Sequence, residues 1–232
     1  MRIRWVITVM FLLTAMGSAA ADSDPVGTQI FTTPTAQTLG EGELRVSSTM
    51  LTLTQFNYGL TDDLQLGVQT VYLFWTGVDL KYRFFQSEKV EASVLGGGGL
   101  WMLNHERHSV YVRPVVTISS DDRNGRGSAR LSLGGSALYN ATAAASGILT
   151  NVFVSGELPA GTNVKLMGEI NYVYDPATTV SGDLTAWSGG TFGARFYGER
   201  AAVDAGLFIP FTDDLLPGRI LGIPLLSFSY LF

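Results

Sequence analysis

One short stretch of the chain holds the residue types that metal sites and hydrolases use. It reads Asn104-His105-Glu106-Arg107-His108-Ser109 and contains both histidines of the protein. In the helical zinc motif His-Glu-x-x-His, the two histidines lie four positions apart and share one face of a helix. His105 and His108 are one position closer than that. The motif geometry is lost, and we expect no metal site.

Ser109 beside His108 suggests a hydrolytic pair, of the kind that membrane-embedded lipases and deacylases use. A serine nucleophile needs a base within hydrogen-bonding reach and a third group that orients this base. No such group stands out in the sequence, and no Gly-x-Ser-x-Gly motif occurs. We therefore expect 104–109 to form a polar loop without catalytic residues, and the chain not to be an enzyme.

Other chemistry is mostly absent from the sequence. The chain has no cysteine, which excludes thiolate catalysis, cysteine-bound metals and disulfide bonds. The glycine-rich stretches 40–42 and 96–99 lack the lysine and the strand–turn–helix context of a phosphate-binding loop. We expect no cofactor. The net charge of −5 is also not that of a nucleic-acid-binding protein.

The first residues predict export. Two arginines precede an apolar run from Trp5 to Met16, and small residues follow before Asp22. This is the organisation of a secretory signal peptide, and the run is too short for a membrane-spanning helix, which needs about 20 apolar residues. We expect a signal peptide at 1–21, with cleavage after Ala21 or Ala20.

The composition requires a place for much apolar surface. Hydrophobic residues make up 46% of the chain and charged residues 15%, whereas soluble domains average about 25% charged residues. No second apolar run is long enough to cross a membrane as a helix. A closed β-barrel is the alternative, because it leaves no backbone group unpaired in lipid.

The chain beyond Glu43 divides into short segments bounded by turn residues, as expected for such a barrel. We place strands at 43–49, 51–60, 64–74, 76–85, 89–102, 109–119, 128–139, 148–158, 164–174, 184–197, 201–211 and 221–232. The sequence thus predicts an all-β, antiparallel up-and-down transmembrane barrel over 43–232, with about twelve strands and with ten or fourteen as alternatives. An irregular N-terminal segment, 22–42, precedes it. The alternative fold is a soluble β-sandwich.

The last strand carries a further pattern. Phe228, Tyr230 and Phe232 share one face, because side chains in a strand alternate with period two. This ending resembles the C-terminal assembly signal of Gram-negative outer-membrane β-barrel proteins, and 58–68 resembles a hairpin common in such proteins of unassigned role. The resemblance implies that the chain lies in the cell outer membrane, in contact with lipid, and that the barrel assembly machinery recognises its last strand.

Charged residues share one parity within the expected strands, and a charge that faced lipid would cost about 2–4 kcal/mol for Arg or Lys. We therefore expect these residues to face the lumen: Asp79, Lys81, Arg83, Glu91, Arg113, Arg130, Glu157, Lys165, Glu169, Arg195 and Asp204. The two signs nearly balance, which favours salt bridges across a closed or narrow interior. We expect Asp79, Lys81 and Arg83 to pair with opposite charges on neighbouring strands, and 22–41 to lie near the periplasmic mouth of the barrel or partly within it. Phe153 and Phe208 are exceptions, since both fall on the polar face. The glycine run 96–99 lies inside an expected strand, and we expect it to let bulky side chains from opposite strands, or the segment 22–41, approach that wall.

These features favour a porin-like passage for small polar solutes. We expect Arg and Glu side chains, rather than a long folded loop, to restrict that passage. A structural or interaction barrel that conducts nothing is the second hypothesis, and a lipid-modifying barrel enzyme is the third. The sequence predicts neither the solute nor the oligomeric state.

Overall fold

The computed structural model describes residues 26–50, 52–71, 75–101, 104–120, 128–141, 146–174, 188–211 and 222–232. The expected signal peptide lies outside these ranges, as do the expected outer connections 175–183 and 212–220. Among the described residues, no helix is long and apolar enough to cross a membrane.

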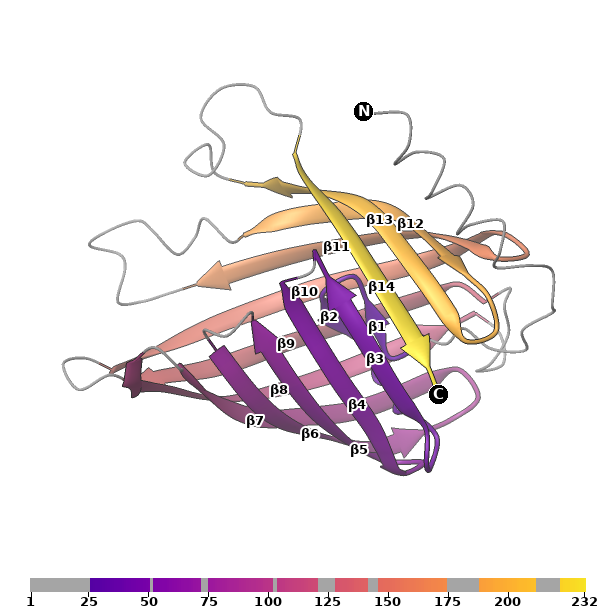
Figure 1. The fold of residues 1–232 in the computed structure, drawn as a ribbon. Coiled ribbons are helices and arrows are strands. Elements are labelled where there is room, and N and C mark those ends of the chain that lie inside the picture. Colours follow the sequence, from indigo (N-terminus) through magenta and orange to yellow (C-terminus); the bar gives the residue numbers. More distant parts are fainter. Residues whose placement is uncertain are drawn as a thin grey trace.

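Twelve antiparallel strands close into a barrel (Figure 1). They are β3 (Leu44–Thr49), β4 (Leu53–Thr61), β5 (Leu64–Val71), β6 (Trp75–Gln86), β7 (Val90–Trp101), β8 (Asn104–Ser119), β9 (Arg130–Ala141), β10 (Ser146–Gly161), β11 (Val164–Tyr174), β12 (Gly189–Tyr197), β13 (Ala201–Pro210) and β14 (Ile223–Leu231). Each strand pairs with its neighbour in the chain, and β14 pairs with β3 to close the circle. The predicted fold class and strand number are confirmed.

One strand boundary differs clearly from the prediction. Residues 104–109 were expected to form a polar loop, but β8 begins at Asn104, and His108 pairs with Leu100 on β7 and with Ala141 on β9. Polar side chains do not prevent backbone pairing, which is why the composition of this stretch was a poor guide to where the strand starts.

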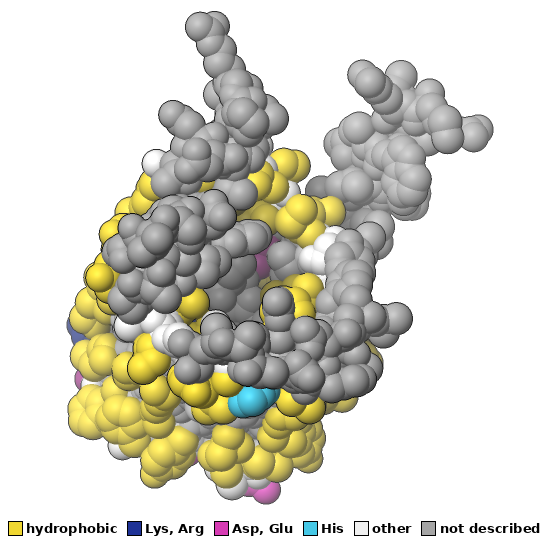
Figure 2. Space-filling model, turned by 90° about the vertical axis from the view of Figure 1, so that its left-hand side faces the viewer, with side chains coloured by type: hydrophobic (Ala, Val, Ile, Leu, Met, Phe, Trp, Pro, Cys, Tyr) yellow, Lys and Arg dark blue, Asp and Glu magenta, His cyan; other side chains and the backbone are white. Residues whose placement is uncertain are grey.

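Side chains of each strand alternate between the two faces of the wall. In β6, Val78, Leu80 and Tyr82 are exposed, whereas Asp79 and Lys81 between them are buried. The same alternation in the other strands places large apolar side chains over the outside of the barrel (Figure 2). The barrel is therefore apolar outside and polar inside.

A short hairpin occupies the interior. Strands β1 (Gln29–Ile30) and β2 (Thr33–Pro34) pair with each other, and Ile30 and Ala36 are completely buried within the barrel. Phe31, in the turn, adopts a positive φ of 39°. The lumen was expected to be restricted by Arg and Glu side chains rather than by a folded loop, and this is corrected: the N-terminal segment, expected near the periplasmic mouth or partly within the barrel, lies inside it as a folded hairpin. We call residues 26–42 the inner segment.

Candidate functional site

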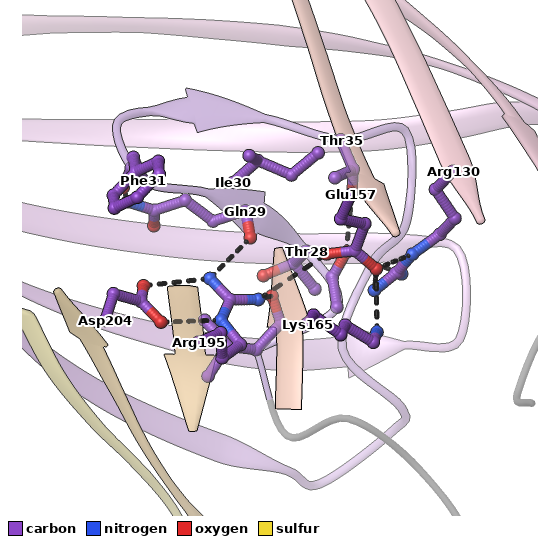
Figure 3. A network of polar contacts seen from close by, with 12 residues as sticks. Thr28, Gln29, Ile30, Phe31, Thr35, Arg130, Glu157, Lys165, Arg195 and Asp204 are labelled. Carbon is purple, nitrogen blue, oxygen red and sulfur yellow. Dashed lines mark hydrogen bonds and ion pairs between the residues drawn. The ribbon is translucent and has the colours of Figure 1, made fainter. Parts of the chain in front are cut away.

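Two wall arginines hold the start of the inner segment by its main chain (Figure 3). Arg195 Nη1 donates to the carbonyl oxygen of Val26 at 3.1 Å, and its Nη2 donates to that of Gln29 at 3.0 Å. Arg130 Nη1 donates to the carbonyl oxygen of Gly27 at 3.1 Å. Hydrogen bonds from charged donors are about twice as strong as neutral ones, so these contacts fix the path of the backbone.

Lys81 and Arg45 extend the same arrangement. Lys81 Nζ donates to the carbonyl oxygen of Thr28 at 3.4 Å and to that of Gln37. Arg45 donates to the Thr28 hydroxyl and to the Gln29 side-chain oxygen, the latter at 3.4 Å. The cations of the wall therefore meet carbonyl and side-chain oxygens of the inner segment as well as carboxylates of the wall.

A single carboxylate binds the turn of the hairpin. Glu169 accepts hydrogen bonds from the backbone N–H of Thr32 and of Thr33, each at 3.2 Å. It also accepts from the two threonine hydroxyls, at 2.6 and 3.0 Å. All four donors belong to the turn and to the start of β2, so one buried acid satisfies most of the polar groups there.

The later part of the inner segment is also attached to the wall. The N–H of Ala36 donates to Thr117 Oγ1 at 2.7 Å, and the N–H of Leu39 donates to Gln65 Oε1 at 3.1 Å. Further on, the N–H of Glu41 reaches the side chain of Asp62, in the turn between β4 and β5. The inner segment thus runs out of the barrel at the end where the short turns lie.

Apolar contacts complete the attachment and explain one of the two phenylalanines on the polar face. Phe153 packs in the interior with Val115 and with Ala36 of the inner segment. Two further clusters join segment to wall: Val26 with Tyr197 and Ala202, and Ile30 and Phe31 with Met167. Phe208 packs over Gly189, where a Cβ atom would lie 2.4 Å from its ring. Both phenylalanines on the polar face therefore lie where they pack against other residues of the interior.

Charged wall residues also pair with one another. Glu157 lies between Lys165 Nζ, at 2.7 Å, and Arg130. Arg195 binds Asp204, with 2.7 Å between Nε and Oδ1. These pairs and the inner segment share the same arginines (Figure 3). The network is therefore one connected unit rather than a set of separate bridges.

The first three lumen candidates of the sequence were expected to pair with opposite charges on neighbouring strands. Arg83 does so, with Glu91 at 3.2 Å and with Asp63 at 2.8 Å. Lys81 instead binds carbonyl groups of the inner segment. Asp79 accepts from Gln69 at 3.2 Å and from the Tyr111 hydroxyl at 3.3 Å.

The structure brings all the lumen candidates to the interior side of the wall. Arg113 lies in β8 and lines a cavity of about 500 Å³. The cavity lies between the hairpin and the end of the barrel opposite the short turns. It is also lined by residues of the inner segment (Thr28, Gln29, Thr32, Pro34), amides (Gln55, Asn57, Gln65, Gln69, Asn140), charged groups (Arg45, Asp79, Lys81) and aromatic rings (Trp75, Trp101, Tyr111).

Trp75 and Tyr111 were not predicted as lumen residues, although the glycine run 96–99 was a signal for them. A Cβ atom at Gly99 would lie 2.4 Å from the Trp75 ring, and one at Gly97 would lie 2.9 Å from the Tyr111 ring. We expected these glycines to admit side chains from opposite strands or the N-terminal segment. The rings come from β6 and β8, the direct neighbours of β7.

His108 and Ser109 cannot act as a catalytic pair. His108 is exposed and Ser109 is buried at 5% exposure, because neighbours in a strand point to opposite faces. The side chain of His105 lies outside the described residues. Within the described part of the chain, no three potential metal ligands of the His, Cys, Asp or Glu type gather in one place.

The aromatic residues of the last strand lie on the outer face. Phe228 and Phe232 are exposed, and the ring of Tyr230 lies 4.8 Å from that of Phe232 in an edge-to-face arrangement. Ser227 and Ser229 between them are buried on the lumen side. Leu231 has the parity of these serines.

Comparisons with known proteins address the fold. No family model matches the chain, and no curated protein sequence matches it. The structure of the NanC porin in a rhombohedral crystal form matches with a TM-score of 0.50 and 8% identity, over 82% of this chain and 97% of that one. The KdgM porin in complex with disordered oligogalacturonate gives 0.48 and 6%, over 82% and 95%. CdiB from Acinetobacter baumannii gives 0.31 and 11%, over 82% and 59%. The chain is thus a closed twelve-stranded β-barrel whose fold resembles that of a porin.

Proposed function

We propose that this chain is a porin-like barrel of the outer membrane that admits small polar solutes, and that the inner segment closes its lumen. The polar cavity of about 500 Å³, with the hairpin as its floor, is the observation that carries the proposal. A solute can occupy the cavity, but it can pass only when the inner segment moves.

The size of the barrel supports an interior with room for both a segment and a solute. About eight strands enclose a lumen filled by side chains, whereas 16–18 strands leave an open channel. Twelve strands lie between these limits. The apolar outer face supports a location in lipid, since a band of apolar side chains is what a barrel presents to a bilayer.

The orientation follows from the connections. Short turns of such barrels face the periplasm, and the inner segment leaves the lumen beside one of them, the turn that holds Asp62 and Asp63. In this orientation the inner segment closes the periplasmic half, and the cavity belongs to the outer half. Solutes would then enter the cavity from outside, and release inward would depend on the inner segment.

A disulfide tests this proposal, because the chain has no cysteine of its own. Ala36 of the inner segment packs in one cluster with Val115 of β8, so Ala36→Cys with Val115→Cys should attach the segment to the wall. We expect reduced protein, starting at Asp22, to conduct in planar bilayers and oxidised protein to be silent. Each single cysteine variant, treated identically, is the control.

A non-conducting structural barrel is the second candidate, and the dense attachment of the inner segment favours it. It would replace the porin-like proposal if wild-type protein, the reduced double variant and Glu169→Ala, which frees the hairpin turn, were all silent. The lipid-enzyme hypothesis rested on His105, His108 and Ser109, and it loses the pair of His108 and Ser109, whose side chains lie on opposite faces of the wall.

A further inference from the structure

Among the described residues, one cation of the cavity has no hydrogen-bond acceptor. Arg113 lines the cavity, and its Nε is buried without a hydrogen-bond partner. Among the described residues its guanidinium has one close contact, the ring of Tyr111, whose centroid lies 5.9 Å from Cζ. Arg45 and Lys81 line the same cavity, but both bind the inner segment.

Asp79, the one carboxylate among the described residues of the cavity lining, makes no hydrogen bond to Arg113. Asp79 is hydrogen-bonded to Gln69 Nε2 and to the Tyr111 hydroxyl, at 3.2 and 3.3 Å. Both of these bonds are accepted by Asp79 Oδ2. The described lining contains three cationic side chains and one anionic side chain. Two of the cations donate to the inner segment, and Arg113 is the third.

A buried N–H group without an acceptor is unfavourable, because it has lost hydration and gained no partner, and Arg113 Nε is such a group. An incoming anion removes this penalty. The guanidinium is planar and presents parallel N–H groups that match the two oxygens of a carboxylate. The ring of Tyr111 restrains Arg113 by a cation–π contact, so little side-chain freedom remains to be lost on binding.

We propose that Arg113 is the binding residue for the carboxylate of a small organic anion that enters the cavity. The amides of Gln55 and Asn140 and the hydroxyl of Ser136 offer partners for the polar groups of such a solute, and Leu138 and Trp75 offer contact to its carbon skeleton. The apolar part of the lining favours an organic carboxylate over inorganic phosphate. The inference rests on the proposed function in one respect, since the solute must reach the cavity.

Binding can be measured without conduction. Trp75 and Trp101 line the cavity, so their fluorescence in the detergent-solubilised full chain reports on occupancy. We expect succinate to change the fluorescence with saturation and to bind more tightly than phosphate, and neutral succinamide to have no effect. Arg113→Gln should weaken succinate binding by about tenfold to a hundredfold, the range for loss of a charge-assisted hydrogen bond, and Arg113→Lys should weaken it less.

Arg200 provides the matched control. It is exposed in the turn between β12 and β13, away from the cavity, and Arg200→Gln removes the same charge from the protein. Equal succinate binding by wild type and Arg113→Gln, equal binding of succinate and succinamide, or tighter binding of phosphate would overturn the inference. A barrel that binds succinate but never conducts would refute the proposed function and leave Arg113 as a binding residue.

Discussion

Neutralising Glu169 should release the inner segment while the barrel stays closed. Glu169→Gln keeps the size of the side chain but removes the charge that four donors of Thr32 and Thr33 share. A hydrogen bond to a charged group contributes about 1.5–3 kcal/mol and a neutral one about 0.5–1.5 kcal/mol. The difference is about 1 kcal/mol for each bond.

These four bonds are not independent, since they converge on one carboxylate. A total of about 2–3 kcal/mol is therefore a reasonable expectation. Because 1.4 kcal/mol corresponds to a factor of ten in an equilibrium constant, the fraction of molecules with a detached hairpin should rise about thirtyfold to a hundredfold. The backbone pairing of β11 with its neighbours does not involve the Glu169 side chain, so the barrel itself should remain folded.

Labelling of a single cysteine measures this change. Ala36 is completely buried, so Ala36→Cys reacts with a maleimide only when the inner segment leaves the wall. The labelling rate should rise with the detached fraction in the Glu169→Gln background. Glu91→Gln is the matched control, because Glu91 is a buried lumen carboxylate that binds Arg83 and Gln86. Equal labelling rates in the wild-type and Glu169→Gln backgrounds would refute the assigned role of Glu169, as would an equal acceleration by Glu91→Gln.

Arg113→Ala should shift the ion selectivity of the conducting barrel toward cations, as measured by reversal potentials, without faster labelling of Ala36→Cys. Arg130→Ala should accelerate that labelling, because Arg130 holds Gly27. Equal labelling rates in the two variants would contradict this difference between the arginines. Changing Phe232 to Asp should impair assembly far more than Leu231→Asp, since the two side chains have opposite parity; equal yields of heat-modifiable barrel on gels would contradict the assignment of faces. Gly99→Val should displace Trp75, whose ring lies 2.4 Å from the position of a Cβ atom, and should lower thermal stability; Gly147→Ala, which meets nothing within 4 Å, should not.

The barrel could be predicted because its signals are local. Alternation along each strand, as for Asp79, Lys81 and their apolar neighbours in β6, depends on residues two positions apart. Turn residues such as Asp62 and Asp63 mark the strand ends in the same way. The strand number and the inward face therefore follow from short stretches of sequence, and the structure differs mainly at ends such as Asn104.

The sequence placed the N-terminal segment near the periplasmic mouth or partly within the barrel, but the path and the contacts of the inner segment could not be predicted, because its partners are scattered along the chain. Residues that hold it include Gln65, Thr117, Glu169 and Arg195, and no spacing in residues 26–42 points to them. The near balance of charges suggested pairs across the lumen. Main-chain carbonyl oxygens also accept hydrogen bonds from the cations of the wall, and a count of charged residues does not include them. The clearest signal was Phe153, an aromatic residue on a polar face.

The wall and the inner segment differ in how well their contacts tolerate amino-acid substitutions. Arg195, Arg130 and Lys81 donate to the carbonyl oxygens of Val26, Gly27 and Thr28, and every amino acid carries such an oxygen. Side chains along 26–29 can therefore change through evolution with little effect on these bonds, provided that they fit the available space. The arginines and the lysine have no such freedom. Related barrels should accordingly retain their interior cations while the sequence that those cations hold drifts.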